Sequence, residues 1–350
     1  MRFSRRQAIA TGTAAAAIAV GGGTWWYLQD EDAPKGASER IDLVAGAYAG
    51  PEHESDPELY AMLTLRGGMP KNTTMEVRFF DLEGNSILPP QGIEATLTNL
   101  IAGESTDQVT QTAIGQYAVE LAQTAIQSAG WWQLALSMDG LAVSWTVMLP
   151  DPNLTGFDTP DIGEEDPEAT ALVTNALALL KSRKSLRWWQ WLSGGNGSII
   201  LSIFSVTTPE SNGQPNSFES DSTLAGQVSL DGSAPSFRTD NPRTVTIGDE
   251  GRRYLPDASP EAVNPTQYLP IEEYDTTYTG FEGAHFGITA EIDGVECQLV
   301  AFHLPSAVEA WFAFWIETET ATLRQLFMHS VNHYMHWIYF DIDEPFELTF

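Results

Sequence analysis

Residues 185–206 read SLRWWQWLSGGNGSIILSIFSV, and this stretch decides how the second half of the chain is organised. Its two apolar runs are separated by Gly194-Gly195-Asn196-Gly197, a turn signal between two strands. We therefore predict an antiparallel pair here. Further short apolar runs follow at regular intervals, and we expect strands at residues 224–230, 244–248, 286–292, 296–303, 310–317, 322–329 and 333–341.

A helix is predicted immediately before this stretch. Asp166 is suited to cap its start, Pro167 fits the first turn, and Leu172, Ala176 and Leu180 form an apolar stripe at helical spacing. One helix followed by a long run of antiparallel strands indicates an α+β layout with a strongly curved sheet.

The order of several features in this half resembles the exported lipoprotein-carrier superfamily of LolA and LppX-like proteins. The resemblance implies an antiparallel half-barrel over residues 166–350, whose concave face is covered by helices and holds an acyl chain or other apolar group. The sequence departs from the family in lacking a membrane-tether cysteine and in its acidic insertion at residues 256–283. The matching features are Ser185-Leu186-Arg187-Trp188, Thr246-Ile247-Gly248-Asp249, Tyr254, Asp293-Gly294, Pro305, Ala310-Trp311-Phe312-Ala313-Phe314-Trp315-Ile316, Met328, His333, Tyr334, Met335, Tyr339, Asp341 and Pro345.

The first half, residues 45–152, also consists of short apolar or alternating runs separated by turn signals, which is typical of an antiparallel sandwich. The Asp139-Gly140 dipeptide between two such runs is a strong hairpin signal. Strands are expected at residues 59–65, 74–80, 94–100, 116–121, 131–138 and 142–149.

Gly115-Gln116-Tyr117, Gly130-Trp131-Trp132-Gln133-Leu134 and Asp139-Gly140 resemble the YtkA-like family of small immunoglobulin-like exported domains. Such domains often lie beside copper-resistance proteins, but the pattern of a copper carrier is not visible in this half. The predicted fold class is mainly β: an N-terminal immunoglobulin-like β-sandwich, followed by a C-terminal α+β curved antiparallel half-barrel with a packed helix.

Residues 1–29 are predicted to be a signal segment, because a basic start precedes the small and apolar residues 14–20. Ser4-Arg5-Arg6 resembles the twin-arginine motif, although Ala8 and Ile9 stand where an aromatic residue and a leucine are usual. The alternative is an uncleaved membrane anchor, since residues 7–28 are long enough to span a bilayer. We expect a periplasmic or other extracytoplasmic location, with linkers at residues 30–44 and 153–165.

The chain carries 47 acidic and 17 basic residues, giving a formal net charge of −30. A surface this acidic repels nucleic acid and anionic lipid headgroups, which argues against both as partners. It fits a soluble protein in a salty medium, where the repulsion is screened. The single cysteine, Cys297, excludes an intramolecular disulfide and a zinc site of clustered cysteines, and we expect a buried, inert thiol.

Aromatic residues are concentrated in the predicted strands of the second half. Alternation places Trp189 and Trp191 on one face of their strand, and Trp311 and Trp315 on one face of theirs. Together with Phe286 these residues are the candidate lining of a site for an apolar ligand. The alternative is that they fill the core.

Residues 328–336 read MHSVNHYMH, the most concentrated group of metal-binding residue types in the chain. His329, His333 and Met335 could bind a soft metal such as copper(I). On a helix, His329, His333 and His336 would share a face. If residues 330–332 instead form a hairpin turn, as the family resemblance favours, His329 and His333 lie across from each other and Met335 shares the face of His333. The alternative is a structural role for all three.

Motifs of the common catalytic classes are absent from the sequence, including Gly-x-Ser-x-Gly, His-Glu-x-x-His, the P-loop and the dinucleotide fingerprint. We therefore expect a protein that is not an enzyme. The first hypothesis is a carrier or chaperone-like binder of a lipid or other apolar ligand, in which the sandwich is a docking or spacing module. The alternatives are an envelope metal-binding protein and a structural protein whose domains mediate contacts.

Overall fold

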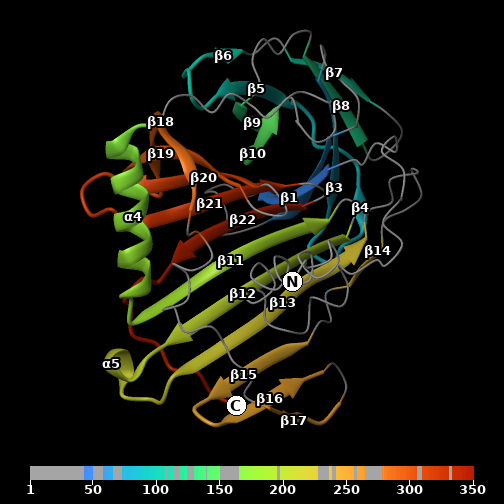
Figure 1. Ribbon diagram of the computed structural model, residues 1–350. Coiled ribbons are helices and arrows are strands. Elements are labelled where there is room, and N and C mark those ends of the chain that lie inside the picture. The colour runs from blue at the N-terminus through green and yellow to red at the C-terminus, as the bar shows by residue number, and fades with distance from the viewer. Residues whose placement is uncertain are drawn as a thin grey trace, which may run out of the picture.

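The computed structural model is built mainly of β-strands, arranged in three antiparallel sheets with one long helix, α4 (Figure 1). The structure describes residues 43–49, 58–65, 73–106, 109–113, 118–123, 130–138, 140–149, 165–194, 198–227, 236–238, 242–255, 258–264, 278, 280–305, 310–330 and 333–350. The predicted signal segment and most of both predicted linkers lie outside these residues. Within the described part of the chain, no helix is long and apolar enough to cross a membrane.

The N-terminal half is a sandwich of two sheets that share one apolar core. The first sheet has the order β1 (Leu43–Ala49), β2 (Leu59–Leu65), β3 (Thr73–Phe80), β8 (Ala118–Gln123) and β7 (Val109–Ala113), with β4 (Ser86–Ile87) paired to β3. The second has the order β10 (Leu141–Leu149), β9 (Gly130–Met138), β5 (Glu94–Asn99) and β6 (Ser105–Thr106).

The predicted hairpin at Asp139-Gly140 is confirmed, because Met138 of β9 pairs directly with Leu141 of β10. Gly140 has a φ of +82°, a conformation that glycine adopts without the steric cost of a Cβ. The sandwich itself is as expected from the alternating runs, whereas its relationship to immunoglobulin-like domains stays a prediction.

The C-terminal half is one open, strongly bent sheet of twelve strands, sheet C, and strands occupy all seven of the predicted positions after the first pair. Sequence reasoning did not predict β14, β16, β17 or the polar first half of β13. The order is β17 (Glu261–Val263), β16 (Glu250–Tyr254), β15 (Arg243–Ile247), β13 (Ser217–Gln227), β12 (Ser198–Thr207), β11 (Ser185–Gly194), β22 (His333–Phe340), β21 (Leu323–Ser330), β20 (Ala310–Glu317), β19 (Val295–Leu304) and β18 (Glu282–Ile292), with β14 (Ser236–Arg238) paired to β13.

The inner face of sheet C is the face covered by α4 (Pro167–Lys181), which contacts β18, β20 and β21. The predicted cap is confirmed: the Asp166 carboxylate accepts hydrogen bonds from the backbone N–H groups of Glu168 (2.8 Å) and Ala169 (3.4 Å). The buried side of α4 consists of small and medium apolar residues: Ala169, Val173, Ala176, Leu177 and Leu180.

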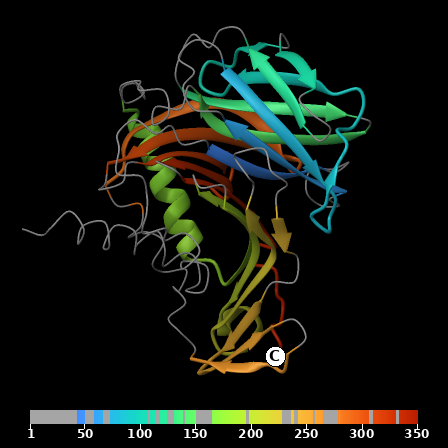
Figure 2. The same cartoon turned by 90° about the vertical axis from the view of Figure 1, so that its right-hand side faces the viewer.

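The outer face of β18–β22 is covered by the sandwich, which Figure 2 shows on the side of these strands opposite α4. Cys297, Leu299, Ala313 and Phe327 of this face belong to the same apolar core as the sandwich. Because β20 is covered on both faces, seven of its eight residues are buried, and its sequence AWFAFWIE is an almost unbroken apolar run.

Hydrogen bonds between described residues connect the sandwich to sheet C. The backbone N–H of Ile288 donates to the carbonyl of Leu100 (2.8 Å), and the N–H of Met148 donates to Nδ1 of the buried His329 (3.4 Å). The outer face of the remaining strands is met by the C-terminal segment, residues 341–350, in which the ring of Phe346 lies 4.1 Å from the guanidinium of Arg187. The outer face is thus covered by the sandwich over β18–β22 and contacted by the C-terminal segment at β11.

Candidate ligand-binding face

The inner face of sheet C carries a layer of large apolar side chains, and α4 contacts the part of it on β18, β20 and β21. Its members alternate with outer-face residues along each strand, and cross-strand pairing brings them into rows. The buried aromatic members are Trp188, Phe204, Phe218, Tyr278, Phe302, Phe312, Phe314, Trp337 and Tyr339.

One part of this layer lies on β19 and β20. Phe302 stacks on its cross-strand partner Phe312 with ring centroids 5.2 Å apart, and Phe314 meets Phe302 edge-on at 4.8 Å. Tyr278 packs edge-on against both Phe312 (5.3 Å) and Phe314 (5.6 Å). Burial raises the pKa of the Tyr278 phenol, so this residue is neutral at physiological pH.

The other part lies on β11, β12, β13 and β22. Trp188 stacks on Phe204 at 5.0 Å, and Phe204 contacts Phe218 at 5.9 Å. Trp337 and Tyr339 of β22 lie 6.3 and 6.4 Å from Trp188. Aromatic pairs in these arrangements add stabilisation to simple area burial.

A polar row interrupts the layer at the level between Trp188 and Leu192. Gln190 of β11 pairs with Ser202 of β12, and Ser202 pairs with Ser222 of β13. All three side chains are buried, and the two serine hydroxyls lie 3.0 Å apart in a hydrogen bond. The Oε1 atom of Gln190 has no hydrogen-bond partner in the part of the chain that the structure describes.

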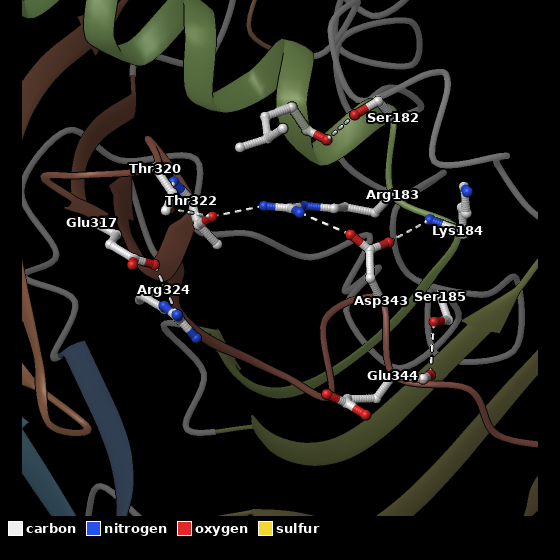
Figure 3. A network of polar contacts seen from close by, with 11 residues as sticks. Ser182, Arg183, Lys184, Ser185, Glu317, Thr320, Thr322, Arg324, Asp343 and Glu344 are labelled. Carbon is white, nitrogen blue, oxygen red and sulfur yellow. Dashed lines mark hydrogen bonds and ion pairs between the residues drawn. The ribbon is translucent and has the colours of Figure 1, made fainter. Parts of the chain in front are cut away.

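The C-terminal end of α4 is held to sheet C through the Arg183–Asp343 network shown in Figure 3. Arg183 donates from Nη1 to Oδ2 of Asp343 (2.8 Å) and from Nη2 to Oγ1 of Thr322 (2.6 Å). The backbone N–H of Lys184 donates to Oδ1 of Asp343 (2.8 Å). Partial burial raises the pKa of Asp343, but these hydrogen bonds and the positive charge of Arg183 outweigh it and lower the pKa below its usual value.

The five aromatic residues proposed from the sequence do not come together. Trp191, Trp311 and Trp315 are at most 2% exposed and lie on the outer face, within the cores shared with the sandwich. Trp189 packs at the edge of the same outer region, and only Phe286 lies on the inner face. Alternation does pair Trp189 with Trp191 and Trp311 with Trp315, but both pairs face away from α4.

The inner-face residues Trp188, Phe312 and Phe314 were missed as site candidates, although each stands next to a residue that was chosen. Phe204 was missed as well; it lies on another strand and pairs with Trp188. Alternation along a strand separates two sets of side chains without saying which set faces the helix. A sequence signal for this face was present: Gln190 and Ser202 are polar residues within apolar runs, and alternation places them on the same face as Trp188 and Phe204.

The proposed metal ligands are also divided between the two faces. His329 pairs with Tyr334, whereas His333 pairs with Ser330, so the predicted juxtaposition of His329 and His333 is wrong by one residue of register. His329 accepts the hydrogen bond from Met148 on the outer face, while Met335 belongs to the inner layer. Among the described residues, no group of three or more His, Cys, Asp or Glu residues could hold a metal ion.

Burial shifts the pKa values of two histidine side chains and one cysteine side chain near this segment toward their neutral forms. Burial lowers the pKa of His333 to about 4 and that of His336 to about 3, so both imidazoles are neutral at pH 7. Cys297 is fully buried in β19, as predicted, and burial raises its pKa to about 11. The Cys297 thiol is therefore protonated at neutral pH.

No protein-family model matches the chain, and no curated protein matches it significantly. Solved structures do match about half of it. LprF from Mycobacterium bovis has a TM-score of 0.40 and 12% identity, covering 54% of this chain and 99% of its own. The Mycobacterium tuberculosis lipoprotein LppX has a TM-score of 0.36 and 14% identity, covering 53% and 100%.

A LolA superfamily protein from Nitrosomonas europaea has a TM-score of 0.23 and 10% identity, covering 52% of this chain and 94% of its own. Members of the superfamily named from the sequence are therefore among the structures that this chain is similar to, over about half its length. Since each of these three TM-scores is below 0.5, the function must be argued from the residues of this chain.

Proposed function

We propose that the protein binds a lipid or other apolar molecule between α4 and the inner face of sheet C, and that it carries or sequesters this ligand without catalysing a reaction. The observation that carries the proposal is the contrast between the two faces of sheet C. The outer face packs against the sandwich and is contacted by the C-terminal segment, whereas among the described elements α4 is the only helix that contacts the inner face, over β18, β20 and β21.

The chemistry of the inner face suits an alkyl chain. Its buried side chains are aromatic or aliphatic apart from a few neutral polar groups, and each methylene of a ligand that moves from water into such a layer contributes about 0.8 kcal/mol. Ala169, Val173 and Ala176 of α4 are small, so a modest outward shift of the helix exposes the larger aromatic side chains beneath it.

The ends of α4 set the limits of such a shift. At the N-terminal end the N–H of Asp166 donates to the carbonyl of Ala284 of β18 (2.7 Å), and at the C-terminal end the Arg183–Asp343 network holds the helix. Between these points the described contacts of α4 with sheet C are apolar and lack direction. A ligand chain therefore enters beneath the middle of α4 while its two ends stay attached.

Export is the second part of the proposal. The basic segment with Ser4-Arg5-Arg6 and the small apolar run after it support passage out of the cytoplasm, and a carrier of apolar molecules is useful where such molecules must cross an aqueous space. The sandwich then serves as a support that covers the outer face of the sheet, as well as a docking or spacing module.

The test compares two adjacent tryptophans of β11 that face opposite sides. Purified protein is incubated with lipid extract and with a fluorescent fatty probe, and bound lipid is measured by native mass spectrometry and by probe titration. Trp188→Ala, on the inner face, is expected to reduce probe affinity about tenfold, whereas Trp189→Ala, on the outer face, leaves it within twofold. Equal effects of the two substitutions, or no lipid bound by the folded wild-type protein, would overturn the proposal.

A further inference from the structure

The polar row Gln190–Ser202–Ser222 is the feature of the inner face that the proposed function does not use. A buried polar side chain costs free energy unless it is hydrogen-bonded, and most such groups have a partner in folded proteins. Gln190 is only 2% exposed, yet its Oε1 has no partner among the described residues. An apolar core gains nothing from such an acceptor, so its place within an aromatic layer points to a ligand.

Strand register fixes the position of this acceptor. Gln190 lies between Trp188 and Leu192, and Ser202 lies between Ile200 and Phe204, and all four flanking residues belong to the inner layer. The side chains of Gln190 and Ser202 therefore point to the inner face as direct cross-strand neighbours. A ligand group at this level meets the free carbonyl oxygen of Gln190 and the serine hydroxyls together.

The hydrogen-bonding capacity of the row defines the ligand group. The carbonyl of Gln190 requires a donor, and the Ser202–Ser222 pair uses one hydroxyl hydrogen in its mutual bond, which leaves the other able to donate to an acceptor. A hydroxyl or primary amide supplies both a donor and an acceptor. A methyl ether supplies only the acceptor and leaves Gln190 unsatisfied.

Charge excludes the anionic alternatives. Among the described residues, Glu76 of the sandwich is the only buried Asp, Glu, Lys or Arg, so no buried cation stands on the inner face to balance a carboxylate or phosphate. The formal net charge of −30 adds long-range repulsion of anions. From these observations we infer that the polar row binds the uncharged, hydroxyl-bearing head group of a single-chain amphiphile, whose alkyl chain lies on the aromatic layer.

This inference rests on the proposed lipid-binding function, and its test separates the two. Oleyl alcohol, methyl oleyl ether and oleic acid share one chain and differ in the head group, and each is titrated against the full-length protein carrying a displaceable fluorescent alkyl probe. The expected order has the alcohol binding about tenfold more tightly than the ether, since the ether leaves a buried acceptor unpaired, and the acid weakest at pH 8.

Gln190→Leu removes the acceptor at nearly constant volume, and it is expected to weaken the alcohol about tenfold while leaving the ether unchanged. Gln325→Leu on the outer face of β21 is the matched control and keeps the preference for the alcohol. If all three compounds displace the probe equally well, or the acid binds best, the inference fails while the lipid-binding function stands. If the folded protein binds neither the probe nor any of the three, the proposed function fails with it.

Discussion

Gly46 of β1 lies directly against the indole of Trp191 of β11: a Cβ atom at Gly46 would stand 2.5 Å from Cε3 and 2.6 Å from Cζ3 of that ring. Trp191 is 1% exposed, and its ring also meets Tyr60 of β2 edge-on at 6.0 Å. The absence of a side chain at position 46 therefore allows β1 to approach β11, and with it the sandwich to approach the outer face of sheet C.

Gly46→Ala is accordingly expected to destabilise the protein by about 2 kcal/mol, because the new methyl group overpacks a site in which the indole is confined. The free energy of unfolding in urea measures the effect. Trp191→Phe shortens the ring, so the double substitution should cost less than the sum of the two single ones. Ser137→Ala, at an exposed position of β9, is the control and should change stability by less than about 0.5 kcal/mol. A fully additive pair would contradict the close approach.

A second glycine, Gly287, allows the sandwich to approach sheet C closely at another place. A Cβ at Gly287 would lie 2.4 Å from the carbonyl oxygen of Leu100, the same oxygen that accepts the hydrogen bond from Ile288. Gly287→Ala is expected to lower the unfolding free energy by about 2 kcal/mol and to increase hydrogen exchange at the Ile288 amide at least tenfold. Thr289→Ala, on the exposed side of the same strand, should leave the exchange rate unchanged; slow exchange in both variants would show that this contact is unimportant.

The strands of this protein could be predicted because apolar runs and turn residues are local signals, as at Asp139-Gly140. Which side chains face α4 and which face the sandwich could not be predicted. In β20 the residues AWFAFWIE are apolar on both sides because α4 lies on one face and the sandwich on the other, so alternation cannot distinguish a core residue such as Trp311 from an inner-face residue such as Phe312. The position of the sandwich was the missing information.

Two other differences have equally local causes. The first half of β13 reads SFESDST, and its acidic and neutral polar residues give no apolar signal even though Phe218 and Ser222 are buried. The hairpin between β21 and β22 pairs Ser330 with His333, and a shift of one residue moves a side chain to the opposite face. The predicted His329–His333 pair depended on that single residue of register.

The Arg183–Asp343 network yields a prediction about α4. Asp343→Asn retains the shape of the side chain but removes the charge that pairs with Arg183, and about 1 kcal/mol of stability should be lost, a modest value because the Asp343 side chain is 41% exposed. Since the pKa of Asp343 is lowered in the folded protein, its contribution is present above about pH 4 and disappears as the pH falls through the folded value.

Glu344→Gln provides the control for that substitution, since Glu344 contributes its backbone carbonyl to Ser185 and its side chain is not part of the network. Thermal unfolding at pH 7 and pH 3 measures both variants. The difference between Asp343→Asn and wild type should be smaller at pH 3 than at pH 7, because pH 3 lies below the usual pKa of this carboxyl in the unfolded chain, which then binds a proton. A difference that is the same at both pH values would show that the charge of Asp343 is not what holds the helix.

His336 makes the stability of the protein depend on pH over a higher range than Asp343 does. Its imidazole is 4% exposed, stacks on Phe327 at 4.1 Å, and has an Nε2 atom without a partner among the described residues. Burial lowers its pKa to about 3, whereas the unfolded chain binds a proton near pH 6.5. Below pH 6.5 the unfolded chain therefore binds a proton at His336 that the folded protein does not bind, and the free energy of unfolding decreases as the pH falls.

The expected loss from this one residue is about 2 kcal/mol between pH 7 and pH 5. His336→Phe keeps an aromatic ring against Phe327 and removes the titration, so its unfolding free energy should fall less over this range than that of the wild type. Because His333 also has a lowered pKa and titrates similarly, the variant retains part of the slope, and adding His333→Gln should remove more of it. Parallel pH profiles for wild type and His336→Phe would mean that this imidazole accepts a proton without leaving the folded state, and that the outer face around it opens to water.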